Sequence, residues 1–153
     1  LLLACALATL AGEADWALTV GPWALAMLLA AAAARLISLR RNATLVPRST
    51  LQSATGIQSS QLVQKSMGMS AGAFNTREFF HGATRLMLTK IKLGFLLLGF
   101  ALPLLLILSA LYSGAGWPWV LAFLVQAPGL LAERWFFFAQ ARHPQNLYYQ
   151  AVA

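Results

Sequence analysis

The side chains of this chain that could move a proton or bind a ligand near a membrane are Glu133, His81 and His143. Glu133 and Arg134 are adjacent opposite charges close to a long apolar run. A carboxylate or an imidazole can act as a proton donor or acceptor, and an imidazole can also ligate a haem iron. Proton transfer and axial haem ligation are therefore the two chemistries to weigh.

Glu133 belongs to a stripe of polar and small residues with the seven-residue repeat of one helix face. The stripe comprises Ala122, Gln126, Gly129, Glu133 and Gln140. At a rise of 1.5 Å per residue, Glu133 lies about 24 Å along a helix begun at Trp117, inside a hydrocarbon core of about 30 Å. The stripe must then face other helices and not lipid. Two roles stay open for Glu133: a polar contact between helices, or proton transfer.

The two histidines lie outside the apolar runs. A membrane haem is held by histidines that project inward from spans, so we expect this chain to bind no haem. His81 is either an interfacial residue bonded to its own loop or a proton-handling group near a quinol. Cys5 is the one cysteine, which excludes an intrachain disulfide and an iron–sulfur cluster. We find no set of catalytic residues, no phosphate loop and no metal-ligand cluster.

The elements that must position these groups are membrane helices. The chain is 59% hydrophobic and 10% charged, whereas soluble domains are about 45–50% apolar and about 25% charged. Apolar runs near the ~20 residues needed to cross a bilayer are expected at residues 1–11, 16–38, 91–112 and 117–139. We predict an all-α polytopic transmembrane bundle, with three complete spans and the end of a fourth. Because Leu1 opens inside an apolar run without a basic leader, we expect a C-terminal part of a longer protein.

Three features within the spans carry structural expectations. Pro103 should bend its span at mid-depth, and Gly94 and Gly99 should allow close helix packing. Aromatic side chains near the span ends are expected to form interfacial belts. They are Trp16, Trp23, Trp117, Trp119, Trp135 and Phe136 to Phe138.

The net charge of +7 is distributed on one side of the expected bundle. Nine of the eleven Lys and Arg residues fall between positions 35 and 92, and they flank apolar spans. This pattern is typical of membrane topology and not of nucleic-acid binding. It places residues 40–90 and the tail 140–153 in the cytoplasm, and residues 12–15 and 112–116 on the opposite side.

The long polar segment contains a candidate docking surface for a water-soluble partner. Asn75 is a good helix N-cap, and Glu78 three residues later completes a capping box. Neighbouring aromatics and an arginine are favoured interface anchors. The candidate docking residues are Phe74, Asn75, Arg77, Glu78, Phe79 and Phe80.

Three polar strings resemble the C-terminal half of the dimethyl sulfoxide reductase membrane anchor subunit family. They are STLQSATGI at 49–57, FNTREFFHG at 74–82 and ERWFFFAQARHPQNLYY at 133–149, joined by GFALP at 99–103. The resemblance implies part of a larger haem-free anchor of about eight membrane helices. It also implies a location in the cytoplasmic (inner) membrane of a bacterium, and partners that are an iron–sulfur electron-transfer subunit and a molybdopterin catalytic subunit.

The same resemblance implies a role in anaerobic electron transport. Such an anchor oxidises menaquinol or ubiquinol, or reduces quinone in the sulfite-dehydrogenase-type relatives, so the chain is a non-catalytic or a quinol-oxidising subunit. The quinol histidine of the family lies in the N-terminal half, so the resemblance places the quinol site mainly there and carries no catalytic residue over to this chain. Glu133 and His81 are the candidates within this chain. A small-molecule transporter fragment is the alternative from another class. It would need broken helices with charges at mid-membrane, whereas Pro103 and Pro128 supply kinks with almost no charge.

Overall fold

The structure is a computed structural model that describes residues 1–46, 50, 52–53, 56–59 and 85–139. The described elements are all helical. They are α1 (Leu2–Leu10), α2 (Ala14–Thr44), α4 (Arg85–Leu96), the π-helical η2 (Leu97–Ala101), α5 (Leu102–Ser113) and α6 (Trp117–Ala139). Three helical stretches are long and apolar enough to cross a membrane: Ala14–Thr44, Leu86–Ser113 and Trp117–Ala139.

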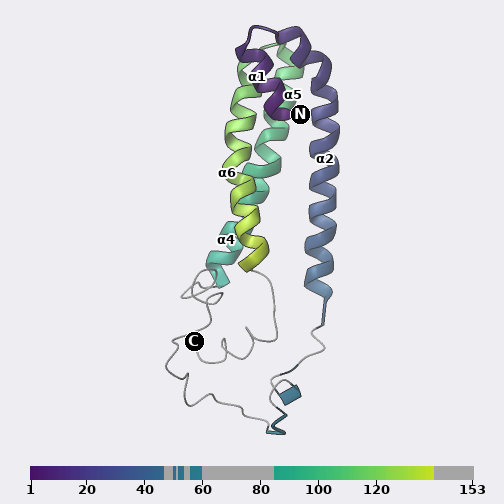
Figure 1. The fold of residues 1–153 in the computed structure, drawn as a ribbon, viewed down its shortest axis with the longest axis vertical. Helices are drawn as coiled ribbons and strands as arrows, with labels where there is room; N and C mark the ends of the chain where they lie inside the picture. Colours follow the sequence, from purple (N-terminus) through teal and green to yellow (C-terminus); the bar gives the residue numbers. More distant parts are fainter. Residues whose placement is uncertain (47–49, 51, 54–55, 60–84, 140–153) are drawn as a thin grey trace.

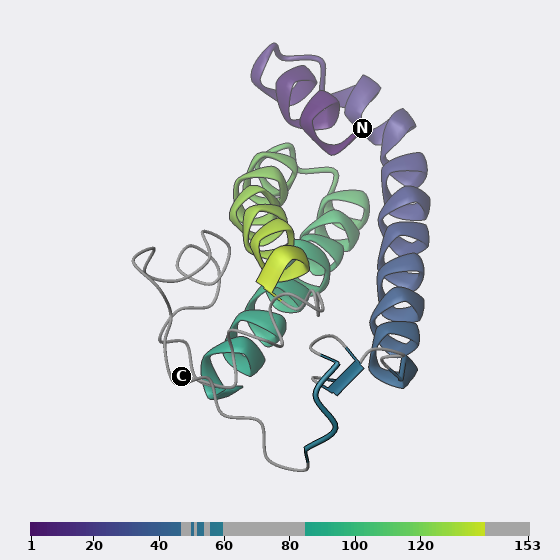
Figure 2. The ribbon, with the colours of Figure 1, turned by 60° about the horizontal axis from the view of Figure 1, so that its bottom comes forward.

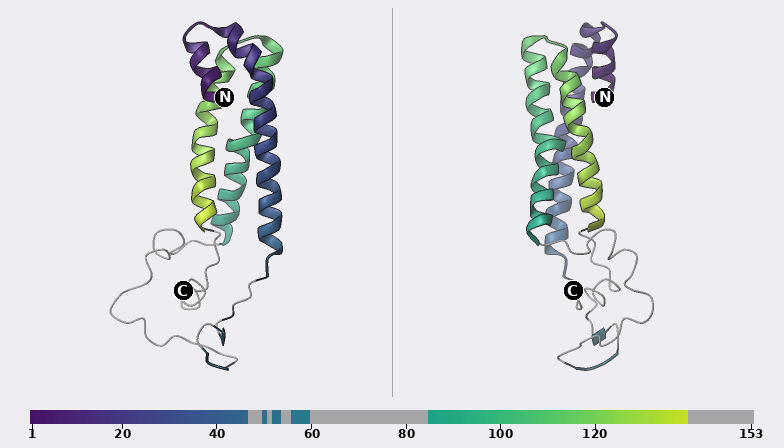
Figure 3. Two further views of the ribbon diagram at one scale, coloured as in Figure 1. Left: turned by 45° about the vertical axis from the view of Figure 1, so that its right-hand side comes forward. Right: turned by 90° about the vertical axis from the view of Figure 1, so that its left-hand side faces the viewer.

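The helices run side by side with both short connections at the same end of the bundle (Figure 1). The first connection joins α1 to α2 and contains Gly12 at φ 86°, and the second joins α5 to α6 and contains Gly114 at φ 67°. Gly114 ends α5 in the left-handed conformation, and its N–H donates to the carbonyl of Ala110. The last residues of α2 and α6 and the first residues of α4 lie together at the opposite end (Figure 3). Residues 12–13 and 114–116 thus lie at one end of the bundle, and the ends of α2 and α6 lie at the other, as the distribution of basic residues predicts.

Helix α2 is longer than the span expected at residues 16–38. It begins at Ala14 and continues to Thr44, so that Arg40 and Arg41 extend it beyond the apolar run as exposed helical residues. Arginine has a high helix propensity and its charged end can reach water, so nothing forces the helix to stop at the membrane edge. Pro22 lies inside α2 without ending it.

Helix α6 lies at the centre of the packing. It contacts α1, α4, η2 and α5, whereas α2 packs on α1 and α5 and touches η2. Between the described helices α2 and α6, no two Cα atoms come within 8 Å. Figure 2 shows α2 standing apart from the other long helices over its later half.

The core near the short connections is organised around Trp119. This side chain is 1% exposed and packs with residues of α1, α2 and α5. Gly21 faces it closely: a Cβ at Gly21 would lie 2.8 Å from Cζ2 of Trp119 and 2.9 Å from Cδ2 of Leu111. The absence of a side chain at Gly21 therefore makes room for the indole.

A second, smaller core cluster lies toward the other end of the bundle. Its buried members are Leu39, Phe95 and Phe136, one each from α2, α4 and α6. The rings of Phe95 and Phe136 are 5.2 Å apart between centroids and tilted by 48°. These three side chains pack α2, α4 and α6 together toward that end of the bundle.

Two of the expected interfacial aromatics are core residues. Trp119 and Phe136 are buried, so the expectation of aromatic belts is wrong for them, because both occupy the α6 face that meets other helices. Trp16, Trp23 and Trp117 are exposed, at 47%, 66% and 59%. Their exposure agrees with positions at the rim of the bundle.

The two glycines of the α4–η2 stretch differ. Gly99 is buried against Gly129 of α6, as expected for close packing. A Cβ at Gly94 would meet nothing within 4 Å, so the expectation of close packing is wrong for Gly94. Only Gly99 falls at the point where the two helices cross.

Candidate functional site

The polar stripe of α6 faces the bundle, as its seven-residue repeat predicts. Ala122 and Gly129 are buried. The side-chain amide of Gln126 donates to the carbonyl of Gly99 at 3.3 Å, and the carboxylate of Glu133 lies against Arg35 of α2. The fifth member of the stripe, Gln140, lies outside the described residues.

The hydrogen bond from Gln126 compensates for a backbone hydrogen bond that proline removes from the neighbouring helix. Pro103 has no N–H, so it cannot donate to the carbonyl of Gly99 four residues earlier. The five residues before α5 are wound as a π-helix, η2, and the N–H of Leu102 reaches the carbonyl of Leu97. Pro103 thus produces a change of winding, and Gln126 supplies a donor to the freed carbonyl. This polar contact is structural, because both partners are backbone or amide groups without a charge.

The charged part of the site is an ion pair between α2 and α6. Nε of Arg35 lies 2.8 Å from Oε1 of Glu133, and the two side chains are 10% and 24% exposed. The N–H of this nitrogen does not point at the oxygen well enough to count as a hydrogen bond, so the contact is an ion pair by distance. It bridges two helices whose backbones are well separated.

The guanidinium of Arg35 also packs against the aromatic ring of Phe95. Its Cζ lies 5.4 Å from the centroid of the Phe95 ring, within cation–π range. Nη2 of the same guanidinium is buried and has no hydrogen-bond partner among the described residues. Neither Nε nor Nη2 of Arg35 therefore has a well-aligned hydrogen-bond acceptor among the described residues.

Arg134, the sequence neighbour of Glu133, contacts an aromatic ring of its own helix. Its Cζ lies 5.2 Å from the centroid of the Phe138 ring on the same helix. The arginine that meets Glu133 comes from a helix about a hundred positions earlier in the sequence.

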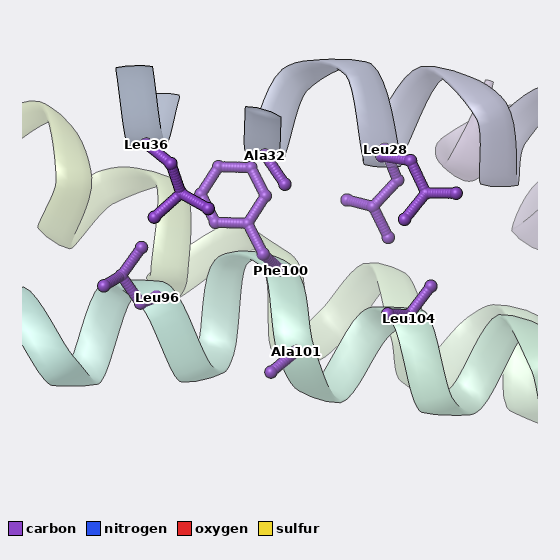
Figure 4. Close-up of a pocket in the computed structure, with 8 residues that line it drawn as sticks. Leu28, Ala32, Leu36, Leu96, Phe100, Ala101 and Leu104 are labelled. Atoms are coloured by element: carbon purple, nitrogen blue, oxygen red, sulfur yellow. The ribbon is translucent and has the colours of Figure 1, made fainter. Parts of the chain in front are cut away.

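A groove of about 260 Å³ runs between α2 and the α4–η2–α5 helix. Figure 4 shows its two walls. They are formed mainly by Leu28, Ala32 and Leu36 of α2 and by Leu96, Phe100 and Leu104 opposite. In this close-up Leu36 and Leu96 face each other at one end, Leu28 and Leu104 lie at the other, and the Phe100 ring reaches toward α2 between them. The lining is entirely apolar.

The groove and the ion pair are neighbours along α2. Leu28, Ala32 and Arg35 have the i, i+4, i+7 spacing of one helix face, so the guanidinium continues the line of the groove-lining residues. On the facing helix, Phe95 under Arg35 directly precedes Leu96 at the end of the groove. The groove therefore ends one residue from Arg35 on α2 and one residue from Phe95 on the facing helix, and Arg35 itself does not line it.

Several residues expected to act lie outside the described part of the chain. His81 and His143 are among them. So is the whole candidate docking surface, Phe74, Asn75, Arg77, Glu78, Phe79 and Phe80. The described residues contain no group of three or more His, Cys, Asp or Glu side chains that could hold a metal ion.

Sequence reasoning missed the role of Arg35, which it counted only among the basic residues that flank the apolar spans. The signal was present in the spacing. Gly21, Ala24, Leu28, Arg35 and Leu39 follow the three-and-four alternation of one packed helix face, and the small or apolar members are buried. An arginine in that register must point at another helix, where an acid is the natural partner.

These features define a multi-pass helical membrane protein with a partly buried ion pair between two spans. The chain is 52% identical over 134 residues to a sulfite dehydrogenase subunit of the bacterium Allochromatium vinosum. The match covers 87% of this chain and 41% of that protein, so the chain spans about two fifths of the length of the curated relative it matches. No family model and no solved structure matches the chain.

The similarity supports a membrane-associated subunit of an oxidoreductase complex. The dimethyl sulfoxide reductase type and the sulfite dehydrogenase type both stay predictions. The similarity also supports a bacterial multi-pass membrane protein, in agreement with the three long apolar helices.

Proposed function

We propose that the chain is part of the membrane subunit of a sulfite dehydrogenase complex and passes electrons from a soluble iron–sulfur subunit to membrane quinone. The observation that carries the proposal is the 52% identity to a sulfite dehydrogenase subunit. The geometry fits this role, since the three long helices would anchor a complex and the partly buried ion pair would give the bundle a polar site within the spans.

The proposal fixes the direction of electron flow. Sulfite and water yield sulfate, two protons and two electrons, and a quinone that takes two electrons and two protons becomes a quinol. The soluble partners are an iron–sulfur electron-transfer subunit and a molybdopterin catalytic subunit. They dock on the end of the bundle where α2 and α6 end and α4 begins, because the long connecting segment and the tail leave the helices there. We assign that end to the cytoplasm, and the membrane to the bacterial inner membrane.

The transporter alternative has less support in the structure. Apart from Asp15 in the first turn of α2, the charged residues of the described spans lie toward one end of the bundle. The partly buried pair joins two helices instead of lining a path at mid-membrane. No observation favours a transport substrate over an electron carrier.

The test is the activity of the complex that co-purifies with the full-length protein. Sulfite-dependent reduction of decylubiquinone by purified complex, lost when this subunit is deleted while sulfite oxidation with a soluble artificial acceptor persists, is the expected result. Decylubiquinol-dependent reduction of dimethyl sulfoxide without sulfite activity would instead assign the dimethyl sulfoxide reductase type. Purification of the protein without redox-active partners would overturn the proposal.

A further inference from the structure

We infer that the Arg35–Glu133 pair holds the second half of α2, residues 29–44, against the rest of the bundle, and that this half moves away from α4 and α6 when the pair is broken. The inference concerns the position of one membrane helix, so it stands whether or not the chain passes electrons. It is carried by the pair and by the way the contacts of α2 are distributed along its length.

The first half of α2 is fixed by close backbone packing. Ala17, Gly21 and Ala24 are buried, and the space at Gly21 is filled by the indole of Trp119. Among the described helices, the Cα atoms of α2 come within 8 Å of α1, η2 and α5 and of no other. The elements beside the last turns of α2 are α4 and the end of α6 (Figure 3), and neither backbone comes that close.

Side chains alone bridge the gap between the second half of α2 and these two helices. Arg35 reaches Glu133 of α6 at 2.8 Å and lies over the ring of Phe95 of α4. One turn later, Leu39 packs into the cluster of Phe95 and Phe136. Before them along α2 the helices are separated by the groove of about 260 Å³. The attachment of this half of α2 to α4 and α6 therefore rests mainly on Arg35 and Leu39.

The charges decide which face of the second half of α2 packs inward. Lipid tails are as apolar as leucine, so the hydrophobic effect does not drive one apolar helix face against another inside a bilayer. Leu29, Leu36 and Ile37 are 49%, 47% and 66% exposed, so this half of α2 offers apolar side chains to lipid as well as to the bundle. The ion pair forms only in one rotation and position of α2. Selecting one such register is the best-attested role of a buried polar pair.

Loss of the pair gives α2 a reason to move and Pro22 gives it a place to bend. Glu133→Gln leaves the guanidinium of Arg35, which is only 10% exposed, without its counter-charge. A long cationic side chain near a span end lowers its free energy by reaching the headgroups. Pro22 lacks an N–H for the carbonyl of Leu18, and proline is the usual site of a helix kink. A change of about 20° there would move Ile37, about 22 Å further along the helix, by about 8 Å.

Distances between spin labels test this movement in the full-length protein. Ile37→Cys in α2 and Leu93→Cys in α4, at positions 66% and 63% exposed, carry the labels, with the native cysteines replaced by alanine. Electron paramagnetic resonance should show this distance lengthened by about 8 Å, or broadened to that extent, in Glu133→Gln and in Arg35→Gln. Arg134→Gln and Arg40→Gln remove an exposed arginine from the same two helices and are the matched controls. They should leave the distance unchanged.

A second pair of labels separates movement of α2 from general loosening of the bundle. Trp23→Cys and Tyr112→Cys, also at exposed positions, report the first half of α2 against α5. Their distance should stay the same in every variant. If it lengthens together with the distance between positions 37 and 93, the pair stabilises the whole bundle and the inference is wrong.

The charge swap, Arg35→Glu with Glu133→Arg, completes the test and remains informative if the single variants do not accumulate in the membrane. It keeps an ion pair between α2 and α6, so the swapped protein should accumulate and recover the unmodified distance between positions 37 and 93. A swapped protein that does not accumulate, or that keeps the longer distance, would overturn the inference. So would an unchanged distance in Glu133→Gln and Arg35→Gln.

Discussion

Where α6 crosses η2, an added methyl group should be tolerated at Gly99 of η2 and not at Gly129 of α6. A Cβ at Gly129 would contact the backbone nitrogen of Gly99 and lie 2.6 Å from both Cα of Gly99 and the carbonyl carbon of Leu98. Carbon atoms pack at about 3.5–4.0 Å, so the helices would have to separate by about 1 Å. These obstacles are backbone atoms, and no side-chain rotation can relieve the overlap.

The free-energy change follows from that separation. Overpacking a fitted contact costs about 1–3 kcal/mol. The hydrogen bond from Gln126 to the carbonyl of Gly99, already 3.3 Å long, would be stretched or lost, and such interhelical bonds contribute about 0.6 and at most about 1.7 kcal/mol. Gly129→Ala should therefore destabilise the bundle by about 2–4 kcal/mol.

Gly99→Ala is the matched control at the same crossing. A Cβ there would lie 3.7 Å from the carbonyl carbon of Gly129, an ordinary contact. The added methyl also raises helix propensity, so stability should change by between zero and about 1 kcal/mol in the favourable direction. Reversible unfolding of the full-length protein in mixed micelles of dodecyl maltoside and SDS, followed by helicity, measures both. Equal effects of the two substitutions would refute the asymmetric crossing.

Two further predictions use other parts of the bundle. Gly21→Ala should lower stability by about 1–3 kcal/mol in the same unfolding assay, because its Cβ meets the buried indole of Trp119; a Gly21→Ala variant as stable as the unmodified protein would contradict this packing. Cysteines introduced as Ser59→Cys and Gly114→Cys should react differently with an impermeant thiol reagent in intact cells, with label at position 114 only. The opposite pattern would reverse the orientation of the bundle.

The sequence predicted the helices well because span length and apolar composition are local properties. Three long apolar helices were expected and found, and the stripe of α6 pointed inward as its spacing required. The ends of α2 were less predictable. An apolar run marks where a helix meets lipid and not where its backbone hydrogen bonds stop, and Arg40 and Arg41 continue the helix into water.

The site was only half predictable, for a physical reason. Glu133 could be found because an acid on an apolar helix stands out by itself. Its partner could not be read from local sequence, since Arg35 and Glu133 meet only when α2 folds beside α6. The expectation that Trp119 lies at the membrane interface was wrong for a related reason. Tryptophan occurs both at the rim and in the core of helix bundles, so its type alone does not place it. The space left by Gly21 on α2 lets the indole of Trp119 pack in the core.

The π-helical turn sets which residues the two halves of one long helix present to α6. Phe95, Gly99, Pro103 and Ile107 are buried at intervals of four, and in a regular α-helix such a series drifts by about 40° per step. The extra residue of η2 absorbs about 100° of that rotation, which is why the series stays on one face. A relative with one residue fewer between Leu97 and Ala101 would keep a span of nearly the same length but turn Phe95 away from Arg35. In an alignment, a single-residue gap at this point would therefore mark a protein that has lost the contact between the phenylalanine ring and the arginine. This would hold even where every other residue of the site is retained.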